Sequence, residues 1–187
     1  MATSTNVVVR KTVKEDLADI IRMIQELADF EGMSNEPQLT VEELARDGGF
    51  SEESPVAAPV FHSFVLELTE SNRTEDNKEK ITSSVSNEGP STRTSLIGYA
   101  ICFYSYSTWR GKSLFLEDIY VKPTYRKHGY GKLLFKAVLS HARETDCVHV
   151  SFHVLAWNPA KEFYIRMGAE NLTEREQWHL FRLSRET

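Results

Sequence analysis

Apolar positions along this chain recur with two periods, and the period changes several times. Some stretches space their apolar residues as a helix does, and others are rich in the β-branched and aromatic residues typical of strands. We therefore expect helices over 12–30, 40–45, 129–143 and 160–167, and strands over 7–9, 61–68, 96–106, 112–121, 148–155 and 178–183. This order of elements predicts an α/β fold, a mixed domain of layered helices and sheet.

Local signals mark the ends of these elements. Thr12 and Glu15 have the spacing of a capping box, in which a hydroxyl and a carboxylate bond early N–H groups of a helix. Gly168 follows the last helix and suits the left-handed residue that commonly ends one. The stretch 109–112, Trp-Arg-Gly-Lys, fits a hairpin turn between two strands.

Residues 69–95 interrupt the pattern. Only Ile81 and Val85 are apolar there, and the other residues are mainly Ser, Thr, Asn, Glu and Lys. Such a segment buries too little apolar surface to offset the entropy of ordering it. We expect a flexible insertion between two strands of a single domain that spans 1–187.

The composition is that of an ordinary globular protein, with 41% hydrophobic and 26% charged residues. No apolar run approaches the roughly 20 residues that cross a bilayer, and the first residues lack the features of a secretory signal. Cys102 and Cys147 give neither a disulfide framework nor a metal-ligand spacing, and the six histidines are scattered. We expect a cytoplasmic protein with two buried thiols, no metal and no contact with a membrane.

The net charge of −5 conceals two blocks of opposite sign. Residues 26–53 contain nine Asp or Glu residues and a single base, whereas residues 122–143 contain six Lys or Arg residues and no acid. Each block could be no more than a solvated face. Their separation nevertheless favours two partners of opposite sign, an anionic cofactor and a cationic substrate. One short basic segment in an acidic chain does not indicate nucleic-acid binding.

The stretch 126–131, Arg-Lys-His-Gly-Tyr-Gly, lies between a predicted strand and a predicted helix. The first N–H groups of a helix lack partners within it, and the helix dipole favours an anion there. Glycine allows the backbone to approach a phosphate closely. Because Glu117 and Asp118 lie on the preceding strand, we expect a phosphate-bearing cofactor beside an acidic reaction centre.

Taken in order, these residues resemble the GNAT superfamily of acetyl-CoA-dependent N-acetyltransferases. The resemblance rests on the strand with Glu117 and Asp118, the Arg-x-x-Gly-x-Gly stretch 126–131, and Asn158 and Tyr164 ahead of Gly168. The stretches 26–31, 107–112, 116–121 and 172–179 are similar to those of the diamine acetyltransferases, the thialysine and spermidine/spermine enzymes. The resemblance implies a GNAT-type, mostly antiparallel sheet flanked by helices, with strands splayed at the acetyl-CoA site.

The resemblance also implies direct transfer of an acetyl group to an amine. Glu117 would accept the proton of the ammonium group, and Tyr164 would protonate the departing thiolate. Asp118, expected on the other face of the sheet, would be structural or would orient its neighbours. The residues implied for the cofactor are Ile119, Tyr120, Val121, Arg126, Lys127, His128, Gly129, Tyr130, Gly131, Lys132, Asn158, Lys161 and Tyr164. At Lys127 the family usually has glycine.

The implied substrate is a small cationic diamine or a lysine-like amine, with thialysine favoured. The implied substrate residues are Phe30, Glu31, Glu117, Phe152, His153 and Glu176. Dimeric relatives build the acceptor pocket from both subunits, so a homodimer is expected. A spermidine/spermine N-acetyltransferase, an acetyltransferase of peptide lysines and a catalytically silent acyl-CoA-binding module remain alternatives.

Overall fold

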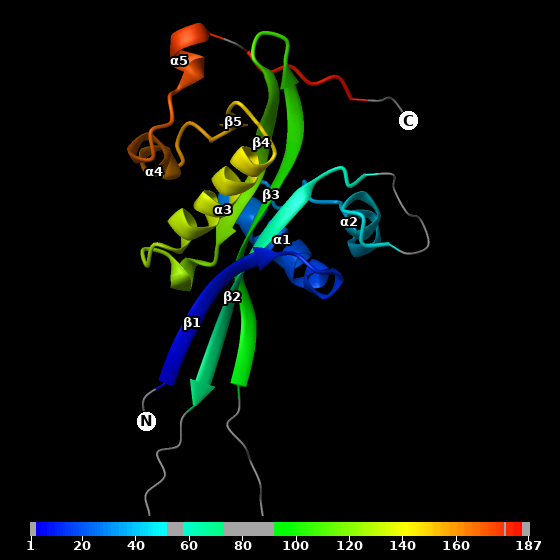
Figure 1. The fold of residues 1–187 in the computed structure, drawn as a ribbon, viewed down its shortest axis with the longest axis vertical. Helices are drawn as coiled ribbons and strands as arrows, with labels where there is room; N and C mark the ends of the chain where they lie inside the picture. Colours follow the sequence, from blue (N-terminus) through cyan, green and yellow to red (C-terminus); the bar gives the residue numbers. More distant parts are fainter. Residues whose placement is uncertain (1–2, 52–57, 73–91, 178, 185–187) are drawn as a thin grey trace, which may run out of the picture. The chain divides into compact units, whose positions relative to one another are not determined.

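The computed structural model describes residues 3–51, 58–72, 92–177 and 179–184, and it divides into two compact units, 1–152 and 153–187. The first unit contains a five-stranded sheet in the order β1-β2-β3-β4-β5 (Figure 1). Its strands are β1 (Thr3–Lys11), β2 (His62–Asn72), β3 (Thr92–Ser107), β4 (Gly111–Val121) and β5 (Val150–Phe152). The first four pair antiparallel and β5 pairs parallel to β4. The predicted mixed, mostly antiparallel sheet is therefore confirmed.

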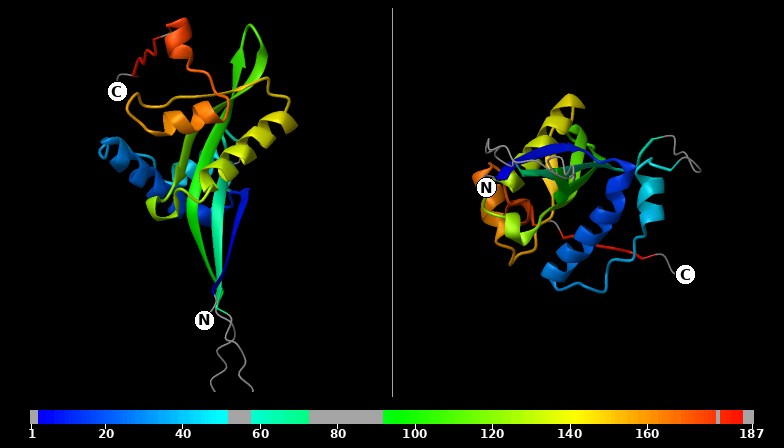
Figure 2. Two further views of the ribbon diagram at one scale, coloured as in Figure 1. Left: turned by 90° about the vertical axis from the view of Figure 1, so that its left-hand side faces the viewer. Right: turned by 90° about the horizontal axis from the view of Figure 1, so that it is seen from below.

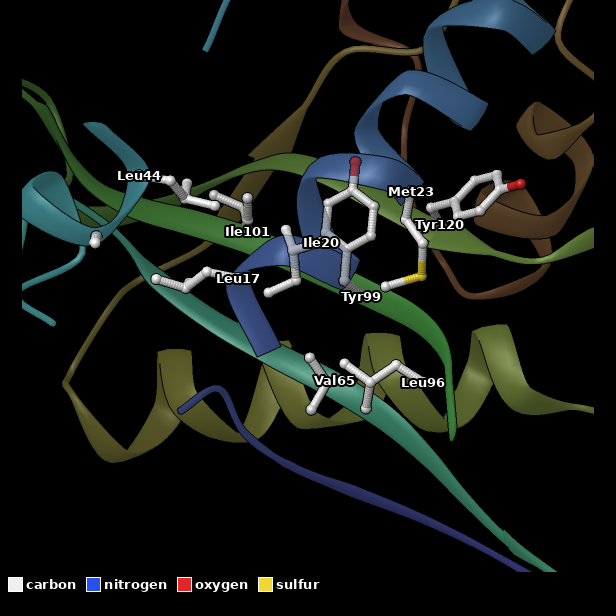
Figure 3. Packing of buried hydrophobic residues seen from close by; sticks show 10 residues of the cluster. Leu17, Ile20, Met23, Leu44, Val65, Leu96, Tyr99, Ile101 and Tyr120 are labelled. Atoms are coloured by element: carbon white, nitrogen blue, oxygen red, sulfur yellow. The ribbon is translucent and has the colours of Figure 1, made fainter. Parts of the chain in front are cut away.

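Helices cover both faces of this sheet. They are α1 (Leu17–Glu31), α2 (Val41–Asp47) and α3 (Tyr130–Glu144), with short 3₁₀ turns η1 (Lys14–Asp16) and η2 (Pro123–Tyr125). Figure 2 shows α3 on one face and α1 with α2 on the other. The α1 face carries a hydrophobic cluster that joins these two helices to β2, β3 and β4 (Figure 3). Its buried members are Leu17, Ile20, Met23, Leu44, Ala45, Val65, Leu96, Tyr99, Ile101 and Tyr120.

The first helix begins differently from the prediction. Asp16, and not the pair Thr12 and Glu15, supplies the cap: its carboxylate accepts a hydrogen bond of 2.9 Å from the N–H of Val13. The Thr12 hydroxyl is buried without a hydrogen-bond partner among the described residues. The predicted capping box is thus wrong, and α1 starts only at Leu17, after a 3₁₀ turn. The second helix does carry such a box, formed by Thr40 and Glu43.

The strands differ from the prediction at their ends. β2 extends to Asn72 and β3 begins at Thr92, and the two strands are still paired at Ser71 and Thr92. Both ends of the predicted 69–95 insertion therefore belong to the sheet. The centre of that segment, 73–91, lies outside the described residues. β5 has three residues in place of the eight expected over 148–155. The hairpin predicted at 109–112 is confirmed, because Ser107 pairs with Gly111.

The second unit contains two short helices, α4 (Ala160–Arg166) and α5 (Leu172–Glu176). Gly168 has φ +93° and its N–H bonds the Ile165 carbonyl, which confirms it as the residue that ends α4. The strand predicted over 178–183 is wrong, because residues 179–184 form no strand; Trp178 lies outside the described residues. The single domain predicted over 1–187 stays a prediction.

Candidate active site

A β-bulge in β4 brings an acidic residue onto the α1 face of the sheet. Leu116 pairs with Cys102 and Asp118 pairs with Ile101, so Glu117 is an extra residue between these pairs. A bulge breaks the strict alternation of side chains along a strand. Asp118 therefore shares a face with Tyr99, whose hydroxyl donates a hydrogen bond of 2.9 Å to its Oδ2. The expectation that alternation sends Asp118 away from this face is wrong.

Asp118 lies among other acidic groups. Burial raises its pKa to about 6, the charges of Glu117 and Glu31 add to the rise, and the hydrogen bond from Tyr99 opposes it. Burial also raises the pKa of Glu31, in the last turn of α1. Glu117 itself is exposed. The structure thus gathers the predicted residues Glu31 and Glu117 around an aspartate that the sequence assigned to a structural or orienting role.

Two aromatic rings and an arginine border this acidic group. The Tyr120 hydroxyl donates to Glu26 Oε2 over 2.9 Å, and burial followed by this contact raises the pKa of Tyr120 to about 12. The Arg126 guanidinium lies 5.2 Å from the ring centroid of Phe30 and 5.4 Å from that of Tyr120. Its Nε also donates to the Val121 carbonyl over 2.8 Å. Arg126 was expected at the cofactor, and its side chain here links the 126–131 loop to α1.

The 126–131 loop has the backbone that its sequence suggested. Gly129 has φ +83° and precedes α3, whose first turn contains no acid. The N–H of Leu133 donates to the Gly129 carbonyl, which is the first hydrogen bond of the α3 helix pattern. The N–H groups of Tyr130, Gly131 and Lys132 come before it. A Cβ added at Gly131 would meet no atom within 4 Å, so the space over this helix end is open.

Lys127 is the unusual residue of the loop. Its φ is +67°, a left-handed conformation that L-residues other than Asn and Asp rarely adopt. Lys127 and His128 are exposed, and the His128 ring stacks on that of Tyr130 at 5.8 Å. The loop therefore carries cationic side chains around an open helix N-terminus.

The end of β4 offers a second binding surface. Pairing with β5 stops at Leu116 and Phe152, so β4 has no ladder partner on that edge over 119–121 among the described residues. The Lys122 N–H bonds the Ile97 carbonyl of β3. Because N–H directions alternate along an antiparallel strand, those of Ile119 and Val121 point to the open edge. This is where a thioester carbonyl was expected to bind.

An open hollow lies next to the same elements. It has a volume of about 440 Å³ and is lined by Glu26, Asp29, Tyr120, Lys122, Pro123 and Thr124. The sequence prediction included Tyr120 but neither Glu26 nor Asp29, although both lie in the acidic block over 26–53. The charge block was thus the signal that could have identified them.

The remaining predicted residues have local partners. Phe152 packs edge-on against Phe135 of α3, with ring centroids 5.9 Å apart. In the second unit, Asn158 Oδ1 accepts a hydrogen bond of 2.9 Å from the N–H of Ala160, the first residue of α4. Tyr164 is buried on α4, and the Glu176 carboxylate pairs with Arg175 at 2.6 Å. The roles predicted for Tyr164, Asn158, Lys161, His153 and Glu176 at the active site stay predictions.

No group of three or more His, Cys, Asp or Glu side chains that could hold a metal ion occurs in the described parts of the chain. No helix in those parts is long and apolar enough to cross a membrane.

A sequence model of the acetyltransferase (GNAT) family matches residues 42–169, which include the β4 bulge, the 126–131 loop and Tyr164. The chain belongs to this family. Thialysine N-epsilon-acetyltransferase of Bos taurus is 35% identical over 181 residues, which are 96% of this chain and 94% of the relative. The thialysine N-epsilon-acetyltransferase of Caenorhabditis elegans is 30% identical over 92% of this chain and 89% of its own length.

A further relative and a solved structure complete the comparison of this GNAT acetyltransferase. Human spermidine/spermine N(1)-acetyltransferase-like protein 1 is 32% identical over 95% of this chain, which matches 22% of that longer protein. An aminoglycoside acetyltransferase from an uncultured soil metagenomic sample has a TM-score of 0.61 at 16% identity, covering 96% of this chain and 97% of its own. At that identity the likeness shows the shared fold. The chain is an acetyltransferase, as the sequence predicted.

Proposed function

We propose that this GNAT acetyltransferase transfers the acetyl group of acetyl-CoA directly to a primary amine of a small cationic diamine or lysine-like substrate, with thialysine favoured. The observation that carries the proposal is the group of Glu31, Glu117 and Asp118, on a strand that leads through η2 and the 126–131 loop to the open N-terminus of α3. The acidic group can bind an ammonium group, and the helix N-terminus can bind a phosphate.

Acetyl-CoA fits the residues of the first unit. Its pyrophosphate would meet the N–H groups of Tyr130, Gly131 and Lys132, with Lys127 and His128 nearby, because no acid and no Cβ obstruct that helix end. Its thioester carbonyl would accept hydrogen bonds from the open N–H groups of Ile119 and Val121. Acetyl-CoA supplies the activated acetyl group; the chain supplies the donors that hold it.

The acceptor amine must lose a proton before it reacts. An alkyl ammonium group has a pKa of about 10.4 in water and carries no free electron pair. Glu117 is proposed to take that proton, directly or through a water molecule, while Asp118 and Glu31 attract the cation. The freed amine nitrogen then bonds to the thioester carbon, the carbon–sulfur bond breaks, and Tyr164 is proposed to protonate the departing thiolate. The nitrogen loses its second proton to solvent, which leaves a neutral amide, and Tyr164 regains its own proton from solvent.

The relatives support the substrate class. Three mammalian relatives that match over more than nine-tenths of the chain are named thialysine N-epsilon-acetyltransferase. The relative named spermidine/spermine N(1)-acetyltransferase-like protein 1 keeps a polyamine acceptor as the second candidate. A homodimer with Glu176 acting across the interface, a cytoplasmic location and the lack of a metal stay predictions.

Steady-state kinetics of the full chain with thialysine, lysine, putrescine and spermidine test the substrate. We expect the highest kcat/KM for thialysine. A kcat/KM for spermidine about tenfold higher than that for thialysine would instead establish the polyamine reading.

The alternative of a silent acyl-CoA-binding module is tested by the same assay. Calorimetry that shows acetyl-CoA binding, together with no thiol release in the presence of any amine, would establish this alternative.

Tyr164→Phe tests whether Tyr164 protonates the thiolate. We expect kcat to fall by about 10²-fold or more, with little change in the KM for either substrate. Unchanged turnover with every amine would reject Tyr164 in that role.

A further inference from the structure

Tyr99 on β3 is a polar side chain in the middle of a hydrophobic cluster. None of its surface is exposed, and its neighbours from α1, α2 and the sheet are almost all apolar. Figure 3 shows its hydroxyl pointing away from Val65 and Leu96. A phenylalanine would fill the same space in this cluster, so packing alone does not account for the hydroxyl of Tyr99. That hydroxyl donates to Asp118 Oδ2 over 2.9 Å.

Two acidic groups oppose the negative charge of Asp118. Glu117 precedes it on β4, and Glu31 acts on it from the end of α1. Tyr120 follows on β4, with its hydroxyl bonded to Glu26 of α1 and with Arg126 over its ring. Within the described part of the chain, the hydrogen bond from Tyr99 on β3 is the contact that favours the ionised form of Asp118.

We propose that Tyr99 is a positioning residue of the acetyl transfer: by donating its hydrogen bond it keeps Asp118 ionised and fixed in orientation, so that Asp118 holds the ammonium group of the acceptor. This inference rests on the proposed function, because it needs a cationic acceptor at the β4 bulge. Tyr99 itself touches neither substrate; it acts through Asp118.

The direction of the effect follows from the hydrogen bond. A phenol that donates to a carboxylate stabilises the charged form and lowers the pKa of that carboxyl group. Burial, then the charge of Asp118, raises the pKa of Tyr99 well above its usual value, so Tyr99 keeps its proton and remains a donor at neutral pH. Without the phenol hydroxyl, the pKa of Asp118 would lie above its present value of about 6. At neutral pH the carboxylate would then be partly neutralised.

Tyr99→Phe tests this in the full-length protein. The quantity to measure is kcat/KM for the acceptor amine between pH 5 and 9, which reports ionisations of the free enzyme. We expect the acidic limb to move up by about one pH unit, so that the loss is about tenfold at low pH and small at high pH. The KM for acetyl-CoA stays unchanged, whereas a merely structural defect would lower activity at every pH.

Tyr104→Phe is the matched control. Tyr104 lies on the same strand, and its hydroxyl contacts His141 of α3 at 3.3 Å on the other face of the sheet. This variant also loses one hydrogen-bonding hydroxyl, yet its pH profile should coincide with that of the wild type. An acidic limb that stays in place in a folded Tyr99→Phe protein would overturn the proposal.

A double-mutant cycle with Asp118→Asn adds an independent readout. Once the carboxylate is gone, Tyr99→Phe should change kcat/KM by less than about twofold, because the two residues act as a unit. Full additivity of the two effects would overturn the proposal.

If Tyr99→Phe does not fold, carboxyl NMR of the wild type decides, with Asp118 assigned through Asp118→Asn. A titration midpoint above about 8, with Asp118 neutral at pH 7, would overturn the proposal, whereas a midpoint near 6 or below supports it. This titration needs no turnover, so it is informative even if no amine is acetylated and the proposed function fails.

Discussion

Gly131→Ala separates the stability of the α3 helix from its ability to bind acetyl-CoA. Gly131 is the second residue of α3, it has no positive φ, and an added Cβ would meet no protein atom within 4 Å. Replacing glycine by alanine within a helix stabilises it by roughly 0.5–1 kcal/mol. In a chain of this size that corresponds to a rise in Tm of about 1–4 °C.

Acetyl-CoA binding should respond in the opposite direction. If the pyrophosphate lies against the N–H groups at this helix end, the added methyl group occupies part of its space. Losing one hydrogen bond to a charged group costs about 1.5–3 kcal/mol, which is about tenfold or more in affinity. The Tm and the KM for acetyl-CoA are therefore both expected to rise in Gly131→Ala.

The control is Ser140→Ala, an exposed position on the same helix and far along it from the loop. It should also raise Tm slightly, because alanine has the higher helix propensity, but it should leave the KM for acetyl-CoA unchanged. A Gly131→Ala protein that is more stable and binds acetyl-CoA as the wild type does would refute the assignment of this helix end to the pyrophosphate.

Three further predictions concern stability and charge. Arg10→Met leaves the Asp16 carboxylate, whose side chain is 8% exposed, without its ion pair, so urea unfolding should show a loss of about 3 kcal/mol. In the wild type, burial alone would raise the pKa of Asp16, but hydrogen bonds from Arg10 and a backbone N–H lower it on balance. The contribution of this shift to the free energy of unfolding should be present above about pH 4 and should vanish as the pH falls through the folded-state pKa. Burial lowers the pKa of His141, so stability should decline as pH falls below about 6.5, and His141→Gln should reduce that decline in Tm measured against pH. Lys127→Gly relieves a left-handed φ of +67° and should raise Tm by a few degrees, while loss of the cation raises the KM for acetyl-CoA; a falling Tm would contradict the strain.

The helices could be predicted because their apolar residues recur over many turns. The buried residues Leu17, Ile20 and Met23 of α1 follow that spacing, and α3 begins beside Gly129 as expected. The start of α1 could not be placed, since it depends on Asp16, which is held by Arg10 of β1. That contact joins separate elements and leaves no periodic signal in the sequence.

Short strands were harder to predict than helices. β5 forms only where Leu114 to Leu116 offer it an edge, so the apolar run over 148–155 overstated its length. The composition of residues 178–183 predicted a strand, but residues 179–184 form none. The five-residue helix α5 was missed because it is too short for a helical period to appear.

The site residues divide in the same way. Glu117 and the 126–131 stretch could be proposed as site residues from local loop and strand motifs, and their roles stay predictions. The position of Asp118 beside Tyr99 was not predicted, because the bulge at Glu117 breaks the strict alternation expected of a strand. Its partner Tyr99 lies on a neighbouring strand, and only the register of β3 on β4 brings the two together.

A competition experiment measures whether this chain acetylates a small cationic amine, and which one. Limiting acetyl-CoA is supplied with thialysine, lysine, putrescine and spermidine at equal concentrations, and the acetylated products are quantified by mass spectrometry. Our account predicts acetylthialysine as the main product, with one thiol released for each acetyl group incorporated. Absence of acetyl from all four amines, by a protein that demonstrably binds acetyl-CoA, would contradict it.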